Sequence, residues 1–204
     1  MKPGPFITLF ALLARVDEKT LAVHARALRD AGVLDKGGRG RSAIEVDHVY
    51  FAKLLTSRMA TDRPANAVEA FHRFSGMQLS NVDKHGWVKS VLPDPDHKLI
   101  DFMTAICDPA NRLPDRSDFE VSFDGAAMAT VRTDKAVLSY VDRDWVEGRV
   151  NALGAAGNNA AVQSVLSEAA ASQNSMLGIV ESRSFTSTWL QAVKDIAFPI
   201  GPGK

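Results

Sequence analysis

The chain has 204 residues, of which 46% are hydrophobic, and its formal net charge at pH 7 is zero. This composition is sufficient for a buried core in one domain or two small ones, and the charge balance excludes a generally basic, histone-like protein. The single cysteine, Cys107, excludes an intrachain disulfide and a cysteine-based zinc cluster, and it fits a reducing cytoplasm. An apolar run near the N-terminus is only about nine residues long, so we expect a buried helix and neither a signal peptide nor a membrane span.

The first expected element is a helix over residues 5–16, whose large apolar side chains recur at the spacing of one buried face. A second helix begins after Asp17, a favourable N-cap residue, with Glu18 in the first turn, where the helix dipole favours negative charge. Gly32 ends this helix, because glycine readily adopts the left-handed conformation. The expected buried stripe consists of Leu21, Ala25, Leu28 and Gly32.

The opposite side of the second helix is polar and basic, and such a face suits water or phosphate. It displays Lys19, Thr20, Val23, His24, Arg26 and Arg29. A loop with the sequence KGGRGRS follows, flanked by short β-type runs at residues 33–34 and 43–46, and we expect a two-stranded hairpin there. Its tip would carry Lys36, Arg39 and Arg41, which can pair with phosphate oxygens or enter a minor groove. The alternative interpretation is a solvated loop.

The run ARALRDAGVL at residues 25–34, followed by Lys36 and the GRGR sequence of residues 38–41, resembles the recognition helix and wing of bacterial winged helix-turn-helix transcriptional regulators. Together with MATDRP at residues 59–64, it also resembles uncharacterised regulator-like proteins of bacterial prophages. The resemblance implies that four side chains face base edges and four lie nearer phosphates. These are Lys19, Thr20, Val23 and His24 for the bases, and Arg26, Arg29, Arg39 and Arg41 for the phosphates.

One departure from that family concerns the number of helices. Two helices usually precede the recognition helix, but only residues 5–16 are available here. Either this stretch breaks into two short helices, or a helix after the wing completes the domain.

The middle of the chain predicts further helices and then a change of periodicity. Asp47 can cap a helix over residues 48–60, and residues 77–96 predict a loop or a short helix. Alternating apolar and polar residues then indicate a small antiparallel sheet that must lie on the helices or pair with a second chain. The other expected helices cover residues 65–74 and 96–107, and the expected strands cover residues 119–123, 128–133 and 136–141.

The last sixty residues predict a C-terminal helical tail that is partly flexible. We expect helices at residues 145–153 and 160–172, the second with a thin apolar stripe suited to a dimer seam or a loosely held tail. A last helix over residues 186–197 is amphipathic enough to dock on the rest of the chain.

No motif for catalysis is present in the sequence. The five histidines lack the spacing of metal ligands, and the glycine-rich loop lacks the Walker pattern of a P-loop. Asp142 and Asp144 form a carboxylate pair in a predicted turn, where solvation is the simpler interpretation. We therefore expect a protein that is not an enzyme and that has no metal or other cofactor.

These observations predict an α+β fold, mainly α, with a winged helix-turn-helix followed by helices and a small antiparallel sheet. The expected domains are residues 1–63 for DNA binding, 64–142 for oligomerisation or a partner, and the tail at 143–204. Residues 15–63 carry an excess of three positive charges, which places nucleic acid on this part of the chain. The expected function is a cytoplasmic, sequence-specific regulator that binds double-stranded DNA as a homodimer. The alternatives are a small terminase subunit and a protein whose helix binds another protein.

Overall fold

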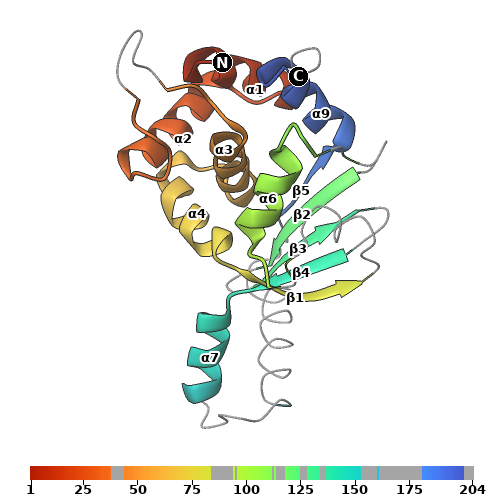
Figure 1. Cartoon of the computed structure of the whole chain (residues 1–204). Helices are drawn as coiled ribbons and strands as arrows, with labels where there is room; N and C mark the ends of the chain where they lie inside the picture. The colour runs from red at the N-terminus through yellow and green to blue at the C-terminus, as the bar shows by residue number, and fades with distance from the viewer. Residues whose placement is uncertain are drawn as a thin grey trace.

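A computed structural model describes residues 1–37, 44–83, 94, 96–111, 113, 118–124, 128–133, 137–152, 160 and 181–199. In these residues a layer of helices lies on one side of a five-stranded antiparallel sheet (Figure 1). The expected α+β class with a mainly helical composition is therefore confirmed.

Three helices form the N-terminal part of the helical layer: α1 (Pro3–Ala14), α2 (Glu18–Asp30) and α3 (His48–Ala60). The stretch before α2 is one unbroken helix, α1. The alternative in which this stretch divides into two short helices is therefore wrong. A three-residue turn joins α1 to α2, and its first residue, Arg15, has a positive φ of 53°. Short turns of this length are typical of helix-turn-helix units.

The ends of α2 and α3 follow from local capping chemistry. The Asp17 carboxylate accepts a hydrogen bond from the backbone N–H of Thr20 at 2.7 Å, and Asp47 accepts one from Tyr50 at 2.7 Å. At its other end α2 stops before Gly32, which has a φ of +76°. The expected caps, the glycine stop and the residue range of α3 are therefore confirmed.

The segment between α2 and α3 differs from the expected hairpin. Residues 33–37 and 44–47 form no strand, and Val33 and Leu34 are instead buried in the core. The backbone N–H groups of both residues donate to the Leu28 carbonyl, which closes the end of α2. The prediction of short β-type flanks was wrong, because these apolar residues pack against helices and pair with no strand. Residues 38–43 lie outside the described residues.

A second set of helices connects α3 to the sheet. A 3-10 turn, η2 (Pro64–Asn66), leads into α4 (Ala67–Ser75), and strand β1 (Gln78–Asp83) follows directly. Helix α6 (Leu99–Cys107) then packs against α3. The loop or short helix expected at residues 77–96 was wrong for residues 78–83, which form a strand.

The sheet has the strand order β1-β4-β3-β2-β5, with all neighbours antiparallel. Its remaining strands are β2 (Asp118–Asp124), β3 (Met128–Arg132), β4 (Val137–Val141) and β5 (Glu181–Thr186). The fully buried side chains of the central strands, among the residues whose burial is described, are Val121, Ala129, Val131, Leu138 and Tyr140. The Tyr140 ring contacts that of Phe102 on α6. This apolar face of the sheet therefore packs on the helical layer.

The C-terminal part of the described chain returns to the N-terminal helices. Helix α7 (Arg143–Ala152) extends away from the helical layer, whereas α9 (Ser187–Ala197) packs beside α1 (Figure 1). Docking of the last helix is thus confirmed. Of the helix expected at residues 160–172, only residue 160 is described.

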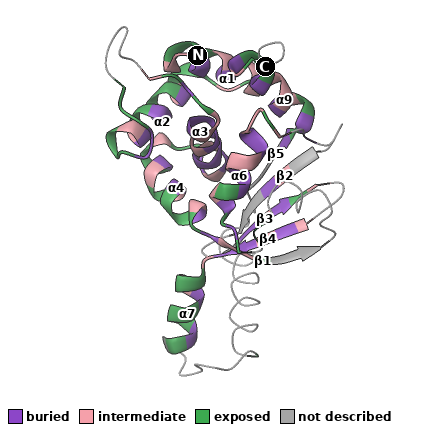
Figure 2. Cartoon of the chain, viewed as in Figure 1, coloured by how far each residue is buried: buried purple, intermediate pink, exposed green. Residues whose placement is uncertain are grey.

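The core is continuous from the N-terminal helices to the sheet. Helix α3 runs through its centre and is largely buried, while α2 and α4 expose their outer sides (Figure 2). Aromatic rings from both ends of the chain meet here: Phe6, Phe10 and Phe51 contact Trp189 or Phe198. The buried cluster spans the domain boundaries expected at residues 63 and 142.

Candidate nucleic-acid interface

Three of the predicted DNA-binding residues are solvent-exposed on the outer face of α2. Lys19, Val23 and Arg26 are exposed and lie three or four residues apart, so they share one helical stripe. Val23 is 50% exposed, so about half of its apolar side chain is open to solvent. This stripe presents a cation, an apolar branched group and a second cation along one side of the helix.

His24 does not belong to this face, and its predicted role in contacting bases was wrong. Its side chain is fully buried, and Nε2 lies 2.9 Å from the Ser57 hydroxyl of α3. That hydroxyl donates to the Ala67 carbonyl at 2.8 Å, so the ring nitrogen must be the donor to Ser57. Leu21, His24 and Leu28 occupy consecutive positions of the buried stripe, and this spacing was the available sequence signal for burial.

Thr20 has a capping role at the start of α2. Its hydroxyl donates to the Asp17 carboxylate at 2.8 Å, in addition to the backbone hydrogen bond. These two hydrogen bonds, that from the side chain above all, lower the pKa of Asp17 below its ordinary value. The Thr20 side chain therefore fixes the start of the helix, at the edge of the exposed face.

The glycine-rich loop is closed at its base. A Cβ atom added to Gly37 would clash with the backbone nitrogen and the side chain of Ile44, so the two ends of the loop lie against each other. Glycine is required at this position for that reason. Arg39 and Arg41 lie outside the described residues, whereas Lys36 is described and exposed.

Three of the predicted residues converge on one hollow with a volume of about 500 Å³. Its cationic side chains are Lys2, Arg26, Arg29 and Lys36, and its carboxylates are Asp30 and Asp35, which leaves an excess of two positive charges. The first turn of α1, the end of α2 and the base of the loop form its walls. Pro3, Gly4, Gly37 and Ile44 complete the lining.

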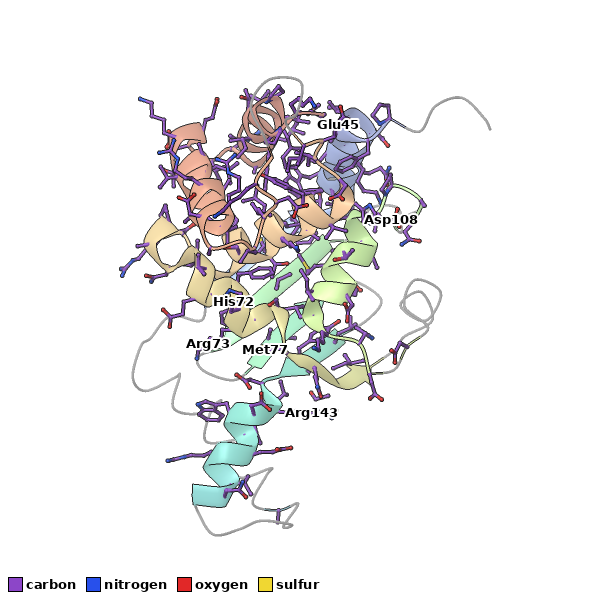
Figure 3. All side chains as sticks on the ribbon, turned by 60° about the vertical axis from the view of Figure 1, so that its left-hand side comes forward. Glu45, His72, Arg73, Met77, Asp108 and Arg143 are labelled. Carbon is purple, nitrogen blue, oxygen red and sulfur yellow. The ribbon has the colours of Figure 1, made fainter. Side chains whose placement is uncertain are left out.

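Lys2 was not predicted from the sequence. It is the N-cap residue of α1, and only the packing of α1 on α2 brings it beside the two arginines. Its ammonium group also lies 3.8 Å from the exposed Glu45 carboxylate, which follows the loop (Figure 3). No local pattern marks Lys2 for this role, because its place beside the arginines depends on the packing of α1 on α2.

Two of the cations interact with other groups of the protein. The Lys36 ammonium donates to the Asp30 carbonyl at 3.1 Å, which satisfies the end of α2. Arg29 is half-buried, and its charge acts on the Tyr50 hydroxyl, whose pKa is nonetheless raised because burial is the larger effect. Lys36 is therefore tied to the end of α2 beside the hollow.

Comparisons with protein-family models, curated proteins and solved structures found no match to this chain. Within the described residues, none of the helices combines the length and apolar character that crossing a membrane requires. The same part of the chain contains no group of three histidine, cysteine or acidic side chains that could hold a metal ion.

Proposed function

We propose that the chain is a sequence-specific DNA-binding transcriptional regulator of the helix-turn-helix type that acts as a homodimer. The observation that supports this proposal is the position of Arg26, Arg29 and Lys36. These three basic residues, which the sequence predicted to contact phosphates or to lie in the loop, surround one hollow directly beside the exposed face of α2. A helix that offers both base-reading and phosphate-binding groups is the basic requirement of major-groove recognition.

In this proposal the exposed stripe of α2 enters the major groove. Lys19 can donate to the acceptor atoms of guanine, and the exposed methyl groups of Val23 can contact the methyl group of thymine. Arg26 and Arg29, one or two turns further along, reach the phosphates at the groove edge. A homodimer would place two such helices on half-sites separated by one turn of the duplex.

The first experiment selects bound sequences from random duplexes and measures affinity for them by fluorescence anisotropy. Replacing Arg26 with Gln should weaken binding to all duplexes and reduce the slope of log K against log salt by about one, because one phosphate contact is lost. Replacing Val23 with Ser should instead change which bases are preferred.

Arg143 supplies the matched control. It is exposed at the start of α7, far from Glu45 and the α2 region (Figure 3). Arg143→Gln removes the same charge and should leave affinity and slope unchanged. Failure of the wild-type protein to bind any duplex at low salt would refute the proposal, as would equal effects of Arg26→Gln and Arg143→Gln. A dimer mass in solution is expected, and a ring of many subunits would contradict the regulator proposal.

A further inference from the structure

We infer that the hollow between α1 and α2 is a phosphate-binding subsite, and that its occupant is a backbone phosphate of the bound duplex. This inference rests on the proposed DNA-binding function and adds a specific contact to it. The phosphate would fix the register of α2 along the groove, because it is held by groups from three separate segments of the chain.

The charge of the lining favours an anion. Four cationic and two acidic residues line the hollow, and the Glu45 carboxylate, 3.8 Å from the Lys2 ammonium group, offsets one more positive charge. Arg26 and Arg29 offer planar guanidinium groups that can bind two phosphate oxygens at once. The Lys36 contact with the Asp30 carbonyl places that ammonium group at the rim. An oxyanion with at least two acceptor oxygens, such as a phosphodiester, fits this set of donors better than a chloride ion does.

The first turn of α1 adds a backbone donor and the positive end of the helix dipole. Pro3 and Pro5 have no N–H group, so Gly4 supplies the one backbone N–H among the first three helical positions. This contribution is secondary to the arginines, because one N–H and a helix dipole stabilise an anion only modestly. It makes Gly4, which lines the hollow, a sensitive position for a test.

The size and openness of the hollow favour a phosphodiester over an isolated ion. Its volume of about 500 Å³ lies within the usual range for ligand sites, roughly 300–1,000 Å³, so it accommodates a phosphate together with the adjoining sugar. A Cβ atom built at Gly4 meets no atom within 4 Å, so the backbone of α1 is open to close approach. The hollow also adjoins Arg26, which belongs to the exposed stripe of α2.

The decisive variant is Gly4→Glu. A carboxylate in the first turn of α1 interacts favourably with the helix dipole and meets no steric obstacle, so the folded protein should be at least as stable as the wild type. The same carboxylate would repel a phosphate in the hollow, and we expect duplex affinity to fall about tenfold or more. Gly4→Ala is the control for helix propensity, and it should retain duplex affinity. Opposite signs for stability and binding cannot arise from unfolding.

A second arm identifies which phosphate is lost. Duplexes of the selected sequence, each with one neutral methylphosphonate, are measured with the wild type and with Arg29→Gln. The wild type should lose affinity at one particular phosphate, and the variant should be insensitive to that substitution, because the contact is already absent. Insensitivity of the wild type at every phosphate would overturn the inference.

The outcomes separate this inference from the proposed function. If the wild type binds no duplex, the proposed function fails and the inference fails with it. If the wild type binds duplex and Gly4→Glu binds it equally well, the function stands and the subsite is overturned. A third arm titrates inorganic phosphate into the wild type and into Arg29→Gln. The inference would also be overturned if Arg29→Gln abolished phosphate binding but kept the duplex affinity of the wild type, because the occupant would then be a free anion.

Discussion

Replacement of Lys194 with Met tests how α9 is joined to α6. The Lys194 side chain is fully buried, and its ammonium group donates to the Asn111 carbonyl at 2.7 Å and to the Ile106 carbonyl at 3.3 Å. It thereby satisfies a carbonyl in the last turn of α6, where the helix dipole also favours a cation. Methionine has a similar length and no donor, so the substitution removes the hydrogen bonds and largely preserves the packing.

The expected loss follows from these two contacts. A hydrogen bond to a charged group contributes about 1.5–3 kcal/mol, and a buried carbonyl left without a donor costs about 1–3 kcal/mol. Against this, the variant no longer buries an ammonium group, whose desolvation costs several kcal/mol. We therefore expect the free energy of unfolding to fall by about 2–3 kcal/mol, which lowers Tm by roughly 4–12 °C in a chain of this size.

The assay is urea denaturation followed by circular dichroism, with Lys19→Met as the control for removal of an exposed lysine. That control should change the free energy of unfolding by less than about 0.5 kcal/mol. Burial lowers the pKa of Lys194 below 10.5, so the folded protein loses this proton at a lower pH than the unfolded chain does. The free energy of unfolding of the wild type therefore rises with pH between the folded-state pKa of Lys194 and 10.5. The variant lacks this group, so the difference in unfolding free energy between the wild type and the variant should grow with pH over that range. A variant as stable as the wild type would refute the reasoning.

Three further sets of substitutions test local features of the fold. Arg15→Gly should stabilise the protein by up to about 1 kcal/mol, because a left-handed conformation costs a residue other than glycine roughly 1–2 kcal/mol. The greater conformational freedom that glycine gives the unfolded chain offsets part of this gain. A lower Tm for the variant would contradict this prediction. Ser57→Ala should destabilise the protein by about 2 kcal/mol, because it leaves the buried imidazole N–H of His24 without its acceptor. Thr56→Val should be neutral or stabilising, because the Thr56 hydroxyl is buried with no hydrogen-bond partner in the described part of the chain. Equal losses of stability for both variants in thermal denaturation would argue against this account. Because the pKa of Asp17 is lowered in the folded protein, its capping contribution is present above pH 3.8 and is lost as the pH falls through the folded-state pKa. Asp17→Asn should therefore make protein stability depend less on pH in the acid range. An unchanged pH dependence of stability in that range would exclude the proposed role of the cap.

Helices with a clear cap and one apolar face were predictable from the sequence. The start of α3 followed from the Asp47 cap, and α9 followed from its amphipathic pattern. Strand β1 was missed because the sequence QLSNVD has little apolar alternation, and its pairing partner, β4, lies more than fifty residues away. Strand β5, with the sequence ESRSFT, was missed for the same reason. Such strands are defined by the neighbouring strand more than by their own residues.

The candidate site was predictable only in part. The exposed positions of Lys19, Val23 and Arg26 followed from helical periodicity, but the burial of His24 depends on Ser57, a hydrogen-bond partner 33 residues away. Histidine occurs both on surfaces and in buried polar contacts, so its residue type was not decisive. The hollow required the packing of α1 against α2, which brings Lys2 near Arg26 and which no local pattern encodes.

The aromatic contacts between α1 and α9 have a consequence for how the protein folds. Phe6 and Phe10 contact Phe198 and Trp189, which follow them by more than 170 residues along the chain. Contacts between residues this far apart close a long loop, and the loss of chain entropy slows their formation. We therefore expect the aromatic core beneath α1 to form late in refolding, after the local contacts within each helix.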